Sequence, residues 1–78
     1  MQGFLVFDAR DGKFGISESV ERFPHTLLEF GQEFEVKDGE KWVKTGLEIV
    51  TDDKGNLLFK LKNTDFQGEL NGLEVKID

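Results

Sequence analysis

Apolar and polar residues alternate with a period of two along most of the chain, and turn signals that contain glycine separate the runs. This alternation is typical of short β-strands that bury one face. The predicted strands are GFLVFD (3–8), KFGIS (13–17), EFEVK (33–37), the segment 42–49, LLFKL (57–61) and LEVKI (73–77). The pattern therefore predicts a small all-β fold of about six antiparallel strands.

The turn at Asp38-Gly39 leaves the pairing of segment 42–49 open between two registers. A two-residue turn there places Val43 opposite Phe34 and Trp42 on the other face, whereas a three-residue loop at 37–39 places Trp42 opposite Phe34. A shift of one residue moves every side chain to the opposite face of the sheet.

The next hairpin chooses between these registers. A three-residue loop of Asp53, Lys54 and Gly55 places Ile49 opposite Phe59 and Leu47 opposite Leu61. It also places Glu48 opposite Lys60 on the outer face, a favourable cross-strand pair. Both hairpins then direct Val43, Leu47 and Ile49 inward and Trp42 outward, with Gly46 as a bulge or bend between two halves of the sheet.

The longest irregular stretch runs from Ser17 to Gln32 and contains the only proline, Pro24, which excludes a single helix through it. Thr26 to Glu29 has the spacing of a capping box, so this loop holds either one helical turn that ends at Gly31 or an extended segment. Some of its apolar residues are predicted to cover the second face of the first strand; the candidates are Val20, Phe23, Leu27, Leu28 and Phe30.

Short, strongly bent strands in one domain of residues 1–78 favour a small SH3-like barrel, because closure removes exposed strand edges. An open meander is the alternative. The predicted core contains Leu5, Phe7, Phe14, Ile16, Phe34, Val36, Val43, Leu47, Ile49, Phe59, Leu61, Leu73, Val75 and Ile77.

Composition and charge narrow the function classes. The chain has no cysteine, a single histidine and a net charge of −6. No apolar run reaches the ~20 residues of a membrane span and no signal peptide is recognisable, so we expect a cytoplasmic protein without membrane association. The negative charge disfavours nucleic acid, whose binding depends on neutralising phosphates.

Catalytic and metal-binding signals are weak. The single histidine, His25, has only Ser17 and Ser19 within the same loop as nucleophile candidates, and the pair Asp52-Asp53 lacks the spacing of a calcium loop. The glycines occur singly at turns and form no phosphate-binding string. We therefore expect no enzyme activity, no catalytic residue, no metal and no cofactor.

The outer face around Trp42 is the best candidate binding surface. The predicted register gathers there Trp42, Lys44, Lys60, Lys62 and Phe66, with Lys41 close by. An aromatic ring among lysines can bind an acidic or proline-rich peptide, or stack single-stranded bases. Alternatively, Trp42 only packs on Phe66 and on lysine side chains. We predict a protein-interaction module, monomeric or weakly dimeric, with a weak single-stranded nucleic-acid binder as the alternative.

Three segments resemble one known family. GFLVFDARDGKFGI, LLEFGQEFEVKDGEKWVKTGLEI and the terminal LNGLEVKI are similar to the DUF5348 family of small uncharacterised proteins. The insertion SESVERFPHT and the run LLFKL depart from the family pattern. The resemblance implies a host among the Firmicutes and a gene on an integrative conjugative element or other mobile DNA, where the chain would act as an accessory factor. It implies no catalytic motif.

Overall fold

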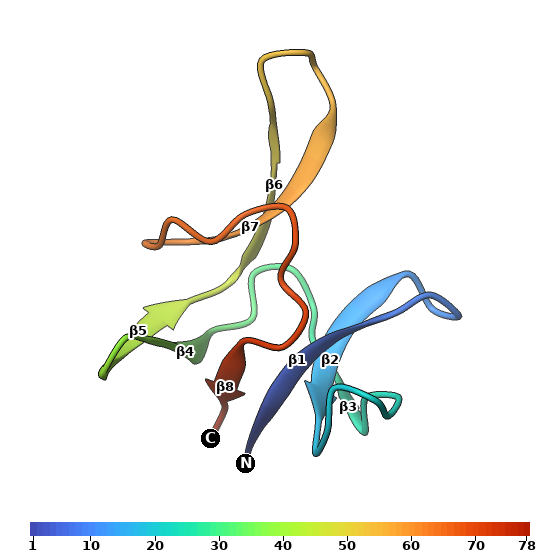
Figure 1. Cartoon of the computed structure of the whole chain (residues 1–78), viewed down its shortest axis with the longest axis vertical. Helices are drawn as coiled ribbons and strands as arrows, with labels where there is room; N and C mark the ends of the chain where they lie inside the picture. The colour runs from blue at the N-terminus through green and yellow to red at the C-terminus, as the bar shows by residue number, and fades with distance from the viewer.

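The computed structural model describes all 78 residues and contains eight β-strands in two antiparallel sheets (Figure 1). The strands are β1 (Gln2–Asp8), β2 (Lys13–Ser17), β3 (Thr26–Leu27), β4 (Phe34–Asp38), β5 (Lys41–Thr45), β6 (Leu47–Thr51), β7 (Leu57–Leu61) and β8 (Glu74–Lys76). No helix is present, and thus none that could cross a membrane. The prediction of an all-β fold is confirmed.

Six strands form one sheet in the order β3-β2-β1-β8-β4-β5, and β6 and β7 form the second sheet. The C-terminal strand β8 lies in the middle of the first sheet, because it pairs with both β1 and β4. Neither sheet closes on itself, so the SH3-like barrel is not confirmed. Figure 1 shows instead that the β6–β7 hairpin projects away from the rest of the chain.

The two strands beyond the predicted six have local causes. Gly46 interrupts the predicted long strand, so β5 belongs to the first sheet and β6 to the second, which confirms the predicted bend. The segment around Thr26 is extended, so the extended alternative is confirmed and the helical-turn alternative is wrong. Its backbone bonds go to β2: the His25 amide donates to the Ile16 carbonyl (3.0 Å) and the Leu28 amide to the Phe14 carbonyl (2.8 Å).

The register of β4 and β5 differs from both predicted pairings. Val36 pairs with Val43 and Asp38 with Lys41, so the two-residue turn is Gly39-Glu40. Gly39 has a φ of 68°, and a type II′ turn requires such a residue at its first central position. The shift is two residues from the predicted two-residue turn, so Val43 still faces inward and Trp42 outward.

The register of β6 and β7 is the predicted one, with Leu47 opposite Leu61 and Ile49 opposite Phe59. Glu48 does lie opposite Lys60, but the two side chains form no ion pair. The Lys60 ammonium donates instead to the backbone carbonyls of Leu61 (3.2 Å) and Thr64 (2.8 Å).

The core combines residues of both sheets and of two loops: Leu5, Phe14, Ile16, Leu28, Phe34, Val36, Leu47, Leu61, Leu70 and Val75. The core prediction is wrong for two residues, since Phe7 is 37% exposed and Ile49 is 49% exposed. Leu47 and Leu61 near Gly46 are buried and Phe59 opposite Ile49 packs against the core, but the core does not extend over Ile49. The loop residues Leu28 and Leu70 fill the core in their place.

The 17–25 loop is attached to the β1–β2 turn through one arginine. The Arg10 guanidinium donates to both carboxylate oxygens of Asp8 and lies 3.6 Å from the centroid of the Phe23 ring. The pKa of the buried Asp8 carboxyl is held below 3.8, chiefly because the Arg10 side chain donates hydrogen bonds to it. Of the apolar residues predicted to cover the second face of the first strand, Leu28 lies in the core with Leu5, and Val20, Phe23 and Phe30 remain exposed, so this cover is not confirmed.

Candidate binding surface around Trp42

Trp42 lies on the outer face of β5, since its neighbour Val43 packs against the core. The indole is half-buried and is absent from the core cluster, so its cover comes from side chains on the same outer face. Lys37 is its direct cross-strand neighbour on β4. The prediction of a partly exposed Trp42 flanked by lysines is confirmed.

Two ammonium groups lie against the indole ring. The Lys76 Nζ is 4.3 Å from the ring centroid and the Lys37 Nζ is 5.9 Å from it. Both distances fall within the range of cation–π attraction, worth roughly 0.5–1 kcal/mol at exposed sites. Lys76 belongs to β8, two strands from β5 in the sheet, so its side chain reaches across β4 to the ring.

The residues predicted for this surface are only partly brought together. Lys44 shares the outer face of β5 with Trp42, two residues along the strand. Lys62 lines a shallow polar hollow with Lys44 and Glu33. Lys60 is bonded to carbonyls next to β7, and Phe66 packs against the core, so neither contributes to the face of Trp42.

Lys37 and Lys76 are the residues that the sequence did not assign to this site. Lys37 could have been found from the turn alone, because the Gly39-Glu40 turn sets it opposite Trp42. Lys76 could not, because its place depends on the insertion of β8 beside β4. We call the set Trp42, Lys37, Lys44 and Lys76 the Trp42 surface.

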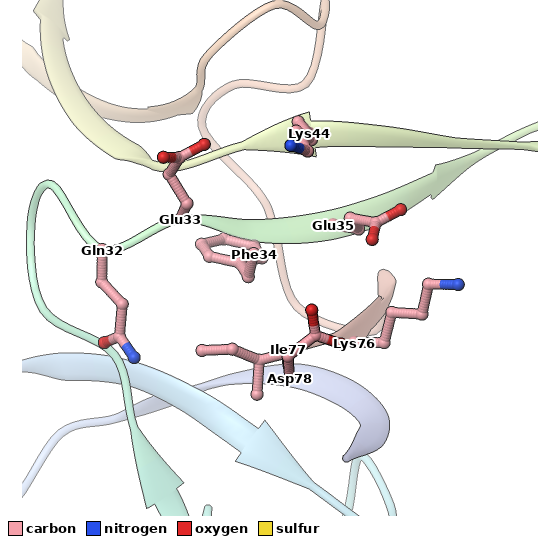
Figure 2. Close-up of a pocket in the computed structure, with 8 residues that line it drawn as sticks. All are labelled: Gln32, Glu33, Phe34, Glu35, Lys44, Lys76, Ile77 and Asp78. Atoms are coloured by element: carbon pink, nitrogen blue, oxygen red, sulfur yellow. The ribbon is translucent and has the colours of Figure 1, made fainter.

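An open hollow of about 360 Å³ adjoins the Trp42 surface (Figure 2). It is lined by Gln32, Glu33, Phe34, Glu35, Lys44, Lys76, Ile77 and Asp78. Glu35 is the cross-strand neighbour of Lys44 on one side and of Lys76 on the other, without an ion pair to either, so cations and a carboxylate alternate across the three strands. Figure 2 shows these charged side chains around the apolar pair Phe34 and Ile77.

The lysines of the Trp42 surface have no carboxylate partner. The ion pairs of the chain are Arg10–Asp8, Lys13–Glu29 and Arg22–Glu18, and none of them involves Lys37, Lys44 or Lys76. No group of three or more His, Asp or Glu side chains is placed to hold a metal ion. The arrangement can therefore bind a negatively charged group beside an aromatic ring.

Comparison with known proteins gives a family and no function. No curated protein and no solved structure matches the chain. The family model described as "Domain of unknown function (DUF5348)" matches residues 3–77, nearly the whole chain. The resemblance inferred from the sequence is thus confirmed, and the chain belongs to the DUF5348 family.

Proposed function

We propose that this protein is a non-enzymatic protein-interaction module, whose Trp42 surface binds an extended acidic segment of another protein. One observation carries the proposal. The ammonium groups of Lys37 and Lys76 lie against a half-buried indole and form no ion pair, on a chain whose net charge is −6. Lys44, which also forms no ion pair, lies on the same outer face. An aromatic anchor framed by cations has the composition of an interface hot spot, and carboxylates would neutralise the cations.

The mixed charge of the neighbouring hollow favours a protein segment over a nucleic acid. Glu33, Glu35 and Asp78 line the hollow together with Lys44 and Lys76. A continuous phosphate backbone would meet these carboxylates at close range, whereas a peptide can place its own charges in register with the alternating pattern. Single-stranded nucleic acid remains the second candidate because an indole beside lysines can also stack a base.

The only tryptophan in the chain lies in the proposed site, so its fluorescence reports binding directly. We would select binders from a displayed library of random peptides and titrate the enriched sequences against the protein. We expect enrichment of Asp and Glu. Lys76→Gln should weaken the selected peptides several-fold, while Lys54→Gln at the tip of the β6–β7 hairpin, a matched loss of one charge, should not.

Trp42→Ala separates a binding role from a purely structural one. Because the indole is half-buried under lysine side chains, we expect a loss of about 1–3 kcal/mol in the free energy of unfolding, with the fold retained. Binding of the selected peptides should fall by about 30-fold, the ~2 kcal/mol of a hot spot. Unchanged affinity in this variant would refute the proposed site.

Oligothymidine serves as the probe for the second candidate. If it binds better than any selected peptide, and its affinity collapses between low and moderate salt, the protein-binding proposal fails in favour of nucleic-acid binding. The link to a mobile element and the cytoplasmic location stay predictions of the sequence.

A further inference from the structure

The β6–β7 hairpin has two outer edges, and the rest of the chain covers only the edge of β7. The edge of β7 is covered, because the Leu61 amide donates to the Phe66 carbonyl (3.0 Å) and the Gly68 amide donates to the Phe59 carbonyl (2.8 Å). The strand β6 pairs only with β7, and no further backbone bond reaches residues 47–51. In Figure 1 the tip of the hairpin projects away from the remaining strands.

The hydrogen-bond pattern identifies which groups of β6 are free. The Asp52 amide donates to the Asn56 carbonyl (2.9 Å), which makes 52–56 a hydrogen-bonded pair of the antiparallel ladder. These pairs alternate along the ladder, so Glu48 and Val50 bond to β7. Leu47, Ile49 and Thr51 therefore direct their N–H and C=O groups outward, where nothing in this chain meets them.

An uncovered apolar surface flanks this edge. Ile49 is 49% exposed and Leu57, on the same face of the hairpin, is 71% exposed. The surface continues to Phe59 and to the exposed Phe30, whose rings are stacked 6.0 Å apart. Patches of this kind mark interaction sites.

The other long edge of the fold carries protection that β6 lacks. The edge strand β5 has Lys41 and Lys44, and the Lys44 carbonyl accepts a bond from the Asn63 side chain (3.3 Å). Lysines and capping groups discourage edge-to-edge pairing. The β6 sequence LEIVT has neither lysine nor proline, and its β-branched residues favour a strand.

We propose that β6 pairs with β6 of a second copy of this chain, antiparallel about a two-fold axis at Ile49. In this register Ile49 lies opposite Ile49 of the second copy and Leu47 lies opposite Thr51. Both are hydrogen-bonded pairs, so every outward N–H and C=O group of β6 gains a partner. The result is a continuous four-stranded sheet in the order β7-β6-β6-β7.

The side chains agree with the same register. On the outer face Glu48 lies opposite Val50 of the second copy, so no like charges oppose each other across the strands. On the apolar face Ile49 meets its own copy and extends the exposed surface of both hairpins. Two copies of β6 thus match each other in both backbone hydrogen bonds and side chains, which favours a second copy over an unrelated strand.

The interface is expected to be weak. Few exposed apolar side chains flank the edge, so the pairing should bury less surface than a standard specific interface. Each copy also carries a net charge of −6, so the two copies repel at low ionic strength. Added salt should therefore tighten the association by screening this repulsion.

Amide hydrogen exchange at micromolar and millimolar concentrations tests the register directly. Amides of Leu47, Ile49 and Thr51 should exchange fast in dilute solution and become protected in concentrated solution, whereas those of Glu48 and Val50 should be protected in both. Sedimentation over the same range should show a monomer–dimer equilibrium. Monomers at millimolar concentration would overturn the proposal, as would protection that arises only when a different protein is added.

Two variants and one control complete the test. Thr51→Pro removes an outward N–H at an edge position, where proline is tolerated, and Ile49→Lys places two lysines opposite each other. Either should weaken dimerisation at least 10-fold with an unchanged circular-dichroism spectrum. Val20→Lys, an equal change of charge at an exposed apolar residue in the 17–25 loop, should have no effect. Dimerisation unaffected by Ile49→Lys, or equally weakened by Val20→Lys, would refute the proposed edge.

Discussion

Phe59 holds the second sheet against the first, and its replacement by alanine should undock the β6–β7 hairpin. The ring lies 5.0 Å from that of Phe14, 6.0 Å from Phe30 and 6.0 Å from Phe7. Truncation of a fully buried Phe costs ~3–5 kcal/mol, and Phe59 is only half-buried, so we expect a loss of about 2–3 kcal/mol in the free energy of unfolding. The total free energy of unfolding of a domain of this size is roughly 4–12 kcal/mol, so the expected loss is a large fraction of the stability.

Urea unfolding followed by circular dichroism measures this loss, with Leu57→Ala as the control. Leu57 lies on the same strand and the same face but is 71% exposed, so its truncation should cost less than about 0.5 kcal/mol. Hydrogen exchange should show amides of β6 and β7 opening before those of the six-stranded sheet in Phe59→Ala. A loss below about 1 kcal/mol, or equal losses in the two variants, would show that this ring does not anchor the hairpin.

Other changes test the core, the sheet and the acid stability. Leu47→Ala at a buried position should cost about 2–5 kcal/mol in urea unfolding, and a cost near zero would contradict its place in the core. Gly15→Ala should lower the melting temperature by several degrees, because its Cβ would lie 2.5 Å from both the Pro24 Cβ and the Thr26 carbonyl oxygen. Gly46→Ala, whose Cβ meets only a carbonyl oxygen at 3.3 Å, should lower it less, and the reverse order would refute the reasoning. The folded-state pKa of Asp8 lies below 3.8. The ionised Asp8 carboxylate therefore stabilises the folded state above pH 4, and this stabilisation is lost as the pH falls through the lower folded-state pKa. Asp8→Asn should therefore be less stable than the parent at pH 7, with a difference that shrinks below pH 4 in melting experiments; a constant difference would contradict this.

The face on which each strand residue lies could be predicted from the sequence, because it depends only on whether the residue number is odd or even within the strand. The loop of Asp53, Lys54 and Gly55 gave the β6–β7 register directly. At Asp38-Gly39 the turn lies one residue further along, since Gly39 occupies the first central position of the turn. The resulting shift of two residues changes every pairing but no face, so Trp42 was placed correctly from an incorrect register.

Arrangements that depend on contacts between distant segments could not be predicted. The position of Lys76 beside Trp42 requires β8 to insert between β1 and β4, and no local pattern specifies that order. Lys60 alternates in the sequence like an outer-face residue, yet the 61–64 turn supplies carbonyls that bind its ammonium group. Period-two patterns state which face a residue is on and leave open what covers that face, which is why Ile49 was assigned to the core.

The barrel was predicted because closure would remove exposed strand edges, and the open structure shows how each edge is protected instead. The edge strand β3 has only two residues, β5 carries lysines, and β7 is covered by residues 66–68. Short strands, charges and covering segments are the known alternatives to closure. The strand β6 has five residues, no lysine and no covering segment, and its one charged residue is Glu48 on the outer face. Its Leu47 and Ile49 are residues that the barrel prediction placed inside. The physical rule that favoured a closed barrel therefore points, in the open fold, to a second copy at β6.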